Sequence, residues 1–294
     1  MPFLREQSGR WSPIKIAAFA GAVAPAIWIA YQAATGELGA RPITEAIHQA
    51  GDWAFRLLLI ALLVTPAQRV LNYPRLALAR RTLGVAAAGY AILHLSLYVL
   101  DQHFDLFKVV SEIVLRIYLT IGAFVLMGLI ALAATSTDAA IRCLGPARWN
   151  RLHRVVYAIA PLAAVHFFMQ SKLNIYQPVL MMGFLLWLLL YRLLLRRNIE
   201  MTPYHLVLLA CTVTAATAAA EATIYMLTSG VDGRMILLAH FDFDLEIRPA
   251  WWVLAAGLVA AAAAAWRWKP RQRSRAGMIS ATALSGATQV QSGS

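Results

Sequence analysis

Residues 116–135 read RIYLTIGAFVLMGLIALAAT, and only the first of them carries a charge. A helix needs about 20 predominantly apolar residues to cross the hydrocarbon core of a bilayer. Stretches of this kind recur along the chain, and eight are expected to span the membrane: 14–34, 53–71, 82–100, 116–135, 150–170, 176–195, 204–228 and 250–268. The sequence therefore predicts an all-α, polytopic transmembrane helix bundle of about eight spans.

The composition agrees with a membrane protein. Of the 294 residues, 60% are hydrophobic and 14% are charged, whereas a soluble domain has about 45–50% apolar and about 25% charged residues. This excludes a soluble enzyme, a disordered chain and a nucleic-acid-binding module, although the net charge is +12. The two cysteines cannot form a disulfide framework, and the absence of a C-x-x-C-H motif excludes covalently attached haem.

The basic residues orient the predicted bundle. Loops on the cytoplasmic side of a membrane carry an excess of Lys and Arg. With the N-terminus inside, most basic residues fall on the cytoplasmic side and most acidic residues on the other. We therefore expect an N-in/C-in orientation, with attraction of the inner face to anionic lipid.

Both ends of the chain need an interpretation of their own. Arg5 and Arg10 precede an apolar run that continues to about Tyr31, as in a signal peptide, but no small-x-small cleavage site follows. We therefore expect a retained span. The segment 276–294 is rich in Ser, Ala, Thr and Gly and is expected to be disordered.

His94 and His166 are the strongest candidates for functional side chains. Ionisable groups at membrane depth are costly and point to function. His94 lies twelve residues into the third span and His166 sixteen into the fifth, so both are about 18–24 Å above the cytoplasmic end. Two histidines at one depth can ligate a haem iron from opposite sides, which favours electron transfer over oxygen chemistry. The alternative is a neutral histidine hydrogen-bonded to a neighbouring helix.

His153 lies near the cytoplasmic surface, at the start of the fifth span. No histidine stands at this depth on the third span, where Arg80 and Arg81 are found instead. His153 either takes part in a second haem site with a different partner or has another role. The alternative is a side chain that reaches the interface between Arg151 and Arg154.

Three other charged residues lie near the outer ends of spans. Haem propionates need cationic or hydrogen-bonding neighbours, and Arg56 and Arg116 are candidates for that role because arginine suits bidentate pairing with carboxylates. The alternative is that both extend to the outer headgroups. Glu221, in the seventh span, is expected to extend to the interface in the same way, and the alternative is a role in proton relay.

Four stretches closely resemble the MsrQ (YedZ) family, the haem-binding membrane subunits of the periplasmic methionine sulfoxide reductase system, within the wider ferric-reductase-like transmembrane group. The resemblance runs from about residue 12 to about residue 197. The stretches are GELGARPITEAIHQAGDWAFRLLLIALLVTP, ARRTLGVAAAGYAILHLSLYVLD, EIVLRIYLTIGAFVLMGLIALAATST and LGPARWNRLHRVVYAIAPLAAVHFFMQSK.

The resemblance implies roles for particular residues. The family's haem-ligand histidines fall on His94, His153 and His166, with the haem held between spans three and five. The family's RRxLG signature begins at Arg80 and Arg81, and its R-P-Y segment reads Arg-Ile-Tyr here from Arg116. The basic residues around His153 are expected to neutralise haem propionates or a flavin phosphate.

The function that the resemblance implies is an electron relay in the bacterial inner membrane. Electrons would come from the quinone pool or a cytoplasmic flavin reductase, pass through haem b, and reach a periplasmic molybdenum-containing catalytic subunit, MsrP. The chain would then be an electron-transfer subunit and not itself the site of sulfoxide reduction. FMN is also attributed to the family.

The C-terminal part departs from the family, whose members typically stop near the sixth span. We expect a ferric-reductase-like six-helix domain over 1–200, two additional helices over 201–275 and the tail 276–294. Two other functions stay open. A self-contained flavin-linked ferric reductase would need a dinucleotide-binding domain that no segment here provides, so its donor would be separate. A non-redox transporter or scaffold would show paired broken helices, which are not apparent.

Overall fold

The computed structural model describes residues 11–171, 175–244 and 246–267, and all regular structure in these segments is helical. Arg5, Arg10 and the segment 276–294 lie outside the described residues. The all-α expectation is confirmed. The helices are α1 (Pro13–Thr35), α2 (Pro42–Val70), the short 3-10 helix η2 (Pro74–Leu76), α3 (Ala77–Asp101), α4 (Leu106–Leu115), α5 (Ile117–Ala134), α6 (Asp138–His153), α7 (Val156–Gln170), α8 (Tyr176–Arg196), α9 (Pro203–Ser229), α10 (Gly233–Ala239) and α11 (Pro249–Arg267).

The predicted spans match the helices. Seven described helices are long and apolar enough to cross a membrane, and α6 with α7, bent by 43° at a short break, adds an eighth if the pair forms one span. The short helices α4 and α10 were not predicted. The chain is thus a multi-pass membrane protein.

Residues at the helix ends explain several boundaries. Proline occupies the first turn of α1, α2 and α9, where its missing N–H costs nothing because that donor has no intrahelical partner. Gly36 and Gly230 end α1 and α9 with φ angles of 76° and 66°, in the left-handed region. Glycine adopts this conformation without steric cost.

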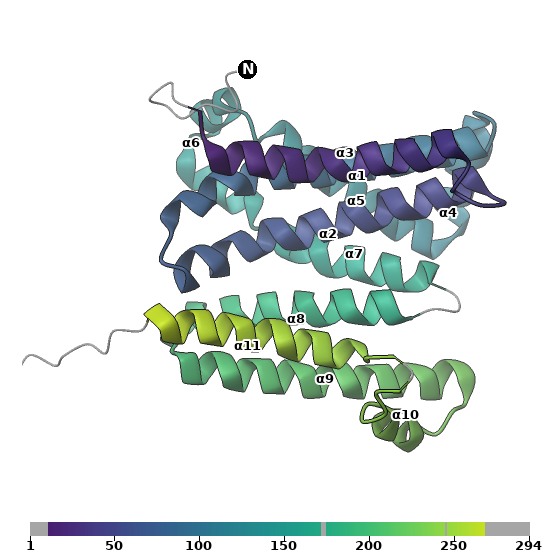
Figure 1. Ribbon diagram of the computed structural model, residues 1–294. Helices are drawn as coiled ribbons and strands as arrows, with labels where there is room; N and C mark the ends of the chain where they lie inside the picture. Colours follow the sequence, from purple (N-terminus) through teal and green to yellow (C-terminus); the bar gives the residue numbers. More distant parts are fainter. Residues whose placement is uncertain (1–10, 172–174, 245, 268–294) are drawn as a thin grey trace, which may run out of the picture.

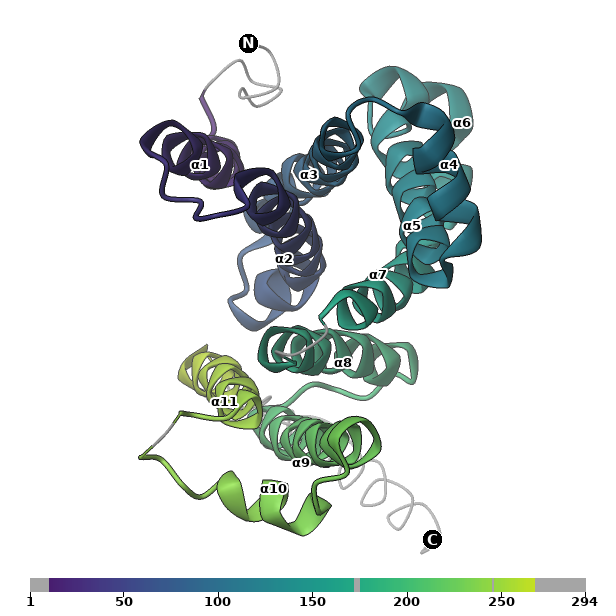
Figure 2. The same ribbon diagram turned by 90° about the vertical axis from the view of Figure 1, so that its right-hand side faces the viewer.

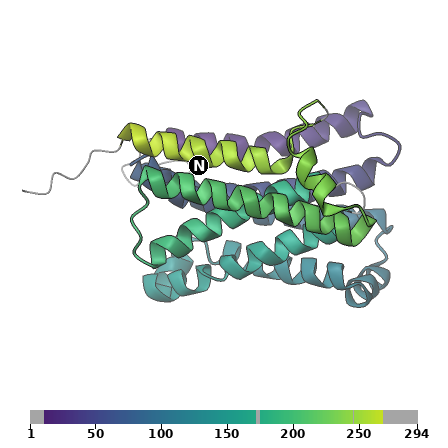
Figure 3. The ribbon, with the colours of Figure 1, turned by 90° about the horizontal axis from the view of Figure 1, so that it is seen from below.

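The helices run roughly parallel or antiparallel to one another (Figure 1). Seen along the helices, α1, α2 and α3 lie on one side and α5 with α7 on the other, while α8 separates this group from α9, α10 and α11 (Figure 2). From below, α9 and α11 cover the underside of the bundle (Figure 3). Helix α8 packs against α2 and α7 as well as against α9 and α11, so it is a wall common to both parts.

Small residues allow the additional helices to approach closely. A Cβ placed on Gly257 of α11 would lie 2.5 Å from the Cβ of Ala210 on α9. A Cβ placed on Gly183 of α8 would lie 2.7 Å from Val253 and 2.8 Å from the hydroxyl of Thr217. Helices in a lipid environment pack through close backbone approach of this kind, because burial of apolar surface contributes little to their association.

The chain is interrupted twice before α7. Gly145 has φ 74° inside α6 and precedes Pro146, and α6 ends at His153 before α7 begins at Val156. The expectation of one helix starting near residue 150 was therefore wrong at this end. His153 belongs to α6, and the spanning helix that carries His166 starts after it.

Candidate functional site

His94, on α3, contacts helix α2 at a backbone carbonyl and at a glycine. Its Nδ1 atom lies 2.8 Å from the backbone oxygen of Ile47 on α2. Its ring also lies over Gly51, where an added Cβ would be 3.0 Å from the same nitrogen. Since Gly51 follows Ile47 by one helical turn, the carbonyl and the glycine lie on one face of α2. We call this pair the carbonyl–glycine contact of His94.

His166, on α7, has the same arrangement on a different helix. Its Nδ1 atom lies 2.7 Å from the backbone oxygen of Tyr118 on α5. A Cβ added to Gly122, one turn after Tyr118, would lie 2.7 Å from Cε1 of the ring, a distance that real Cβ atoms essentially never show. The carbonyl–glycine contact of His166 therefore requires glycine at residue 122.

The two histidine rings face one another across the bundle. Their centroids are 6.3 Å apart and their planes are at 88°. A backbone carbonyl can only accept a hydrogen bond, so each Nδ1 must carry the proton and each Nε2 keeps its lone pair. Among the described residues, neither Nε2 has a hydrogen-bond partner. The pair thus presents two free imidazole nitrogens.

The spacing of the rings fits one metal ion between them. With metal–nitrogen bonds of about 2.0–2.1 Å on opposite sides, two imidazole ring centres are about 6 Å apart. Outer hydrogen bonds from a ligating histidine to a backbone carbonyl are a regular feature of metal sites, because they fix the tautomer and the ring orientation. No group of three or more His, Cys, Asp or Glu able to hold a metal occurs in the described parts of the chain. The site therefore suits a metal ion that is bound in a cofactor, because the cofactor supplies the remaining ligands.

The pair lies toward one end of the bundle. Ile47 is five residues from the start of α2, and Tyr118 is the second residue of α5. His166 is four residues from the end of α7, and His94 is seven from the end of α3. In the N-in orientation this is the outer end, as the depth of the two histidines predicts.

His153 has different surroundings. Its Nε2 lies 3.2 Å from the hydroxyl of Ser136, and its Nδ1 lies 3.1 Å from the backbone oxygen of Trp149. Its ring is stacked on the indole of Trp149 with centroids 3.8 Å apart. Both nitrogens are engaged, and within residues 11–171, 175–244 and 246–267 the ring partner of His153 is Trp149 and not a second histidine.

Arg56 lies deeper than the sequence predicted. Because α2 begins at Pro42 and not near residue 53, Arg56 is in the middle of the helix. Its guanidinium lies 3.6 Å from the carboxylate of Asp52, contacts Gln177 of α8 at 3.5 Å, and stacks on Trp53. It is only partly exposed, with intrahelical and interhelical partners.

Arg116 lies at the junction of α4 and α5, two residues before Tyr118. It contacts the carboxylate of Glu112 at 3.3 Å and the hydroxyl of Tyr118 at 3.1 Å. Glu112 also accepts a hydrogen bond from Tyr98 of α3. Arg116 therefore links Glu112 of α4 to Tyr118, and the backbone carbonyl of Tyr118 binds Nδ1 of His166.

At the opposite end, Arg81 of α3 is paired with Asp138 at the start of α6, at 2.5 Å. Arg80 is exposed. In the described part of the chain neither arginine is hydrogen-bonded to His153, but the charge of Arg80 acts on its imidazole. Ser136, which contacts His153, and Asp138, which pairs with Arg81, are two residues apart.

Sequence reasoning missed Gly51, Gly122 and Arg192. The glycines carry no signal by themselves, because their importance arises from helices distant in sequence. Arg192 lies near the predicted cytoplasmic end of its span, yet it is 8% exposed and donates hydrogen bonds to the hydroxyl of Tyr157 and the backbone oxygen of Leu62. Its position within an apolar run, directly before the last three leucines of α8, was the available signal.

Glu221 also differs from expectation. It is 2% exposed, and its two oxygens lie 3.1 Å from Arg248 and 3.4 Å from Nε2 of His240. It therefore does not extend to the interface. The carboxylate joins α9 to the segment between α10 and α11.

Comparisons with known proteins agree with this arrangement. The family described as ferric reductase like transmembrane component matches residues 50–164, which include His94 and His153 and end just before His166. The chain is similar to the protein-methionine-sulfoxide reductase heme-binding subunit MsrQ of Caulobacter vibrioides, with 42% identity over 170 residues, 58% of this chain and 81% of that protein. It is also similar to the subunit of the same name from Brucella melitensis biotype 2, with 44% identity over 170 residues, 58% of this chain and 76% of that protein. No solved structure matches the chain.

Proposed function

The chain belongs to the MsrQ family, and on that premise we propose that it is the haem b-binding electron-transfer subunit of a methionine sulfoxide reductase system. The observation that carries the proposal is the facing pair His94 and His166, with ring centroids 6.3 Å apart and both Nε2 atoms free. A bound haem b supplies one-electron transfer, and ligation by two histidines favours that over oxygen activation.

The residues of the chain divide the work of holding the haem. His94 and His166 would hold the haem iron through their Nε2 atoms, and the carbonyls of Ile47 and Tyr118 fix each imidazole with its proton on Nδ1. Gly122 lets α5 lie directly against the His166 ring. These contacts restrict both rings before any ligand binds, which lowers the entropy lost on binding.

Charged residues near the pair complete the proposed site. We assign Arg56 and Arg116 to the haem propionates, since both lie on helices that support a ligand histidine and arginine pairs well with carboxylates. Each already has a carboxylate neighbour, Asp52 or Glu112. These acids hold the guanidinium groups in position.

We place the electron donor at the end of the bundle that carries His153, Arg80 and Arg81. The positive-inside rule assigns this end to the cytoplasm. We therefore place the chain in the bacterial inner membrane. The donor is the quinone pool or a cytoplasmic flavin reductase, and the acceptor is a periplasmic molybdenum-containing subunit like MsrP. FMN stays a prediction from the family resemblance alone. For His153, the sequence predicts either a part in a second haem site or another role at this end of the bundle.

The experiment that tests the proposal is a reduced-minus-oxidised absorbance spectrum of the purified full-length protein, followed by electron delivery to the partner. We expect a b-type haem spectrum, and complete reoxidation of an excess of reduced haem by a catalytic amount of the periplasmic subunit only when methionine sulfoxide is present. Quinol and flavin reductase are tried separately as donors. A well-folded protein without haem contradicts the proposal and favours a non-redox scaffold. Haem that reduces ferric iron but not the partner favours a ferric reductase.

A further inference from the structure

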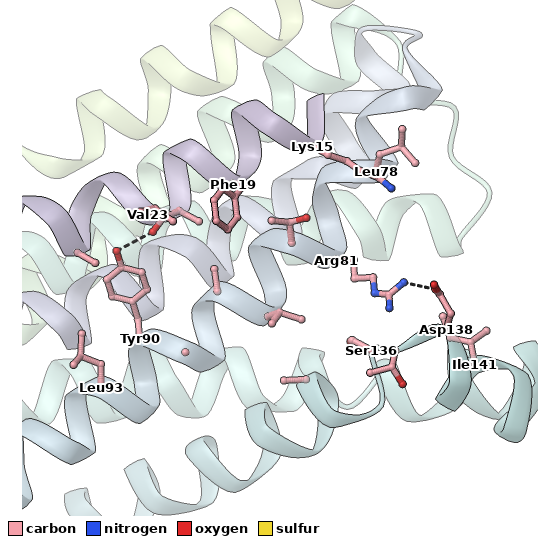
Figure 4. A pocket seen from close by; sticks show the side chains of 18 of the residues that line it. Lys15, Phe19, Val23, Leu78, Arg81, Tyr90, Leu93, Ser136, Asp138 and Ile141 are labelled. Carbon is pink, nitrogen blue, oxygen red and sulfur yellow. Dashed lines mark hydrogen bonds and ion pairs between the residues drawn. The ribbon is translucent and has the colours of Figure 1, made fainter. Parts of the chain in front are cut away.

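A long groove runs along α3, between α1 on one side and the end of α5 with the start of α6 on the other (Figure 4). Its volume is about 1610 Å³. Sites for small ligands are usually about 300–1,000 Å³, so this groove can take a larger occupant. It lies on a different face of α3 from His94, which is not among its lining residues.

The groove has the length of one membrane leaflet. On α3 it extends from Leu78 to Leu93, which is about 22 Å of helix, and on α1 from Lys15 to Ala26, about 16 Å. The hydrocarbon core is about 30 Å thick, so each leaflet contributes about 15 Å. An occupant that lies along these helices therefore reaches from the membrane surface to about the bilayer midplane.

One end of the groove is strongly basic. Lys15, Arg75, Arg81 and Arg142 line this end, with Asp138 as the acidic residue among the lining side chains. Asp138 is already paired with Arg81. The charge at this end is therefore positive, and guanidinium groups bind phosphate oxygens through paired hydrogen bonds.

The rest of the groove is apolar. Phe19 and Val23 of α1 line it together with Leu93 of α3 (Figure 4). Val85 of α3 also lines this part. The one polar ring in this part, Tyr90, donates its hydroxyl proton to the backbone oxygen of Ala22 at 2.8 Å. Phe19 and Val85, both within membrane-spanning helices, are 39% and 42% exposed, so the groove is open toward the lipid.

We propose that this groove binds one anionic phospholipid, with the phosphate among the arginines and the acyl chains along α3. The charge at one end, the apolar surface over one leaflet and the sideways opening each match a part of that molecule. Anionic lipids are also attracted to basic segments at the cytoplasmic surface. The proposal does not depend on haem binding.

Gly89 provides a direct means of blocking the acyl chains. It lines the apolar part of the groove, and a Cβ added there would meet no atom within 4 Å. A leucine side chain at residue 89 would therefore begin in open space on the groove side of α3. Gly21 of α1 is a matched control, since a Cβ there also meets nothing within 4 Å and Gly21 does not line the groove.

The test is native mass spectrometry of the full-length protein titrated with phosphatidylglycerol or with phosphatidylcholine of the same chains. Wild type is expected to retain one phosphatidylglycerol in preference to phosphatidylcholine. The Arg75→Gln/Arg142→Gln variant should bind phosphatidylglycerol about tenfold less tightly or worse, because two cationic groups near the phosphate are lost. Gly89→Leu should lose both lipids, whereas Gly21→Leu and Arg197→Gln should behave as wild type.

Several outcomes would overturn the proposal. Equal retention of phosphatidylglycerol by the groove variants and their controls would show that the groove does not hold the lipid. Displacement of phosphatidylglycerol by inorganic phosphate would show that the basic end recognises a free anion only. Displacement by FMN would assign the groove to a nucleotide. Thermal unfolding of each variant, measured in the same detergent, checks that it is folded.

Discussion

His166 and His153 are close in sequence but differ in what their neighbours leave free. At His166, Nδ1 is held by a backbone carbonyl, Nε2 has no partner, and Gly122 opens space at the ring. At His153, Ser136 and Trp149 engage both nitrogens, and an indole covers one ring face. The residue type is the same, but only the first arrangement presents a ligand atom. Burial and partners, more than the presence of histidine, distinguish the two positions.

The largest expected effect is on the outer pair itself. His94→Ala and His166→Ala each remove one of two axial nitrogens, so we expect near-complete loss of haem from the purified protein. Pyridine-haemochrome content per chain measures it. His153→Ala is the control and should retain the outer haem. Unchanged haem content and spectrum in both outer variants would exclude this pair as the ligands.

The glycines should show a graded effect. Gly122→Ala places a Cβ 2.7 Å from the His166 ring, whereas Gly51→Ala places one 3.0 Å from His94 and Gly84→Ala meets nothing within 4 Å. Changes in the residues that orient metal ligands typically cost about 10–100-fold in affinity, so we expect that range for Gly122→Ala.

Haem affinity and reduction potential measure this series. We expect a smaller effect for Gly51→Ala and none for Gly84→Ala. Equal behaviour of all three variants would show that the histidine rings do not need the carbonyl–glycine contacts.

A smaller and different effect is expected at His153. Its replacement by alanine should slow haem reduction by the physiological donor several-fold, while haem content stays near that of wild type. The physical reason is position, because His153 lies at the end of the bundle opposite the pair. Stopped-flow reduction with quinol and with flavin reductase measures the rate. Loss of all haem from an inserted protein, or unchanged kinetics with both donors, contradicts this division of roles.

The smallest effect on haem is expected from removal of the additional helices. A chain ending at Asn198 keeps all three candidate histidines, so its haem spectrum should persist. Its stability should fall, because Trp187 and Gly183 of α8 lose their packing against α9 and α11. Haem content and thermal unfolding of the inserted protein separate the two effects. Loss of haem without loss of insertion would show that α9 and α11 complete the site.

Hydropathy was enough to predict the spans but not all of their ends. The outer turns of α2 contain Glu45, His48 and Asp52, which lower the mean hydropathy of that segment. The helix nevertheless continues through them, since Gln49 pairs with Glu45 and Arg56 with Asp52 at one-turn spacing. Mean hydropathy over a window of the sequence does not detect local polar pairs of this kind.

The histidine pair could be predicted from depth, whereas its supporting groups could not. Depth depends only on distance along each helix, which sequence gives directly. The contacts of His94 with Ile47 and of His166 with Tyr118 depend on how the helices are rotated and packed. The same reason applies to Arg192, whose partners Tyr157 and Leu62 lie on two other helices.

Glu221 is synthesised 27 residues before Arg248, the residue that neutralises it. At about 5–20 residues per second, this interval lasts roughly one to five seconds, and a charged residue at the centre of a helix costs about 2.5–3.5 kcal/mol on insertion. During that time the unpaired carboxylate of Glu221 makes transfer of α9 alone from the insertion machinery into lipid unfavourable. We expect α9 and α11 to enter the bilayer together. We expect such a pair of helices to be gained or lost in evolution as one unit.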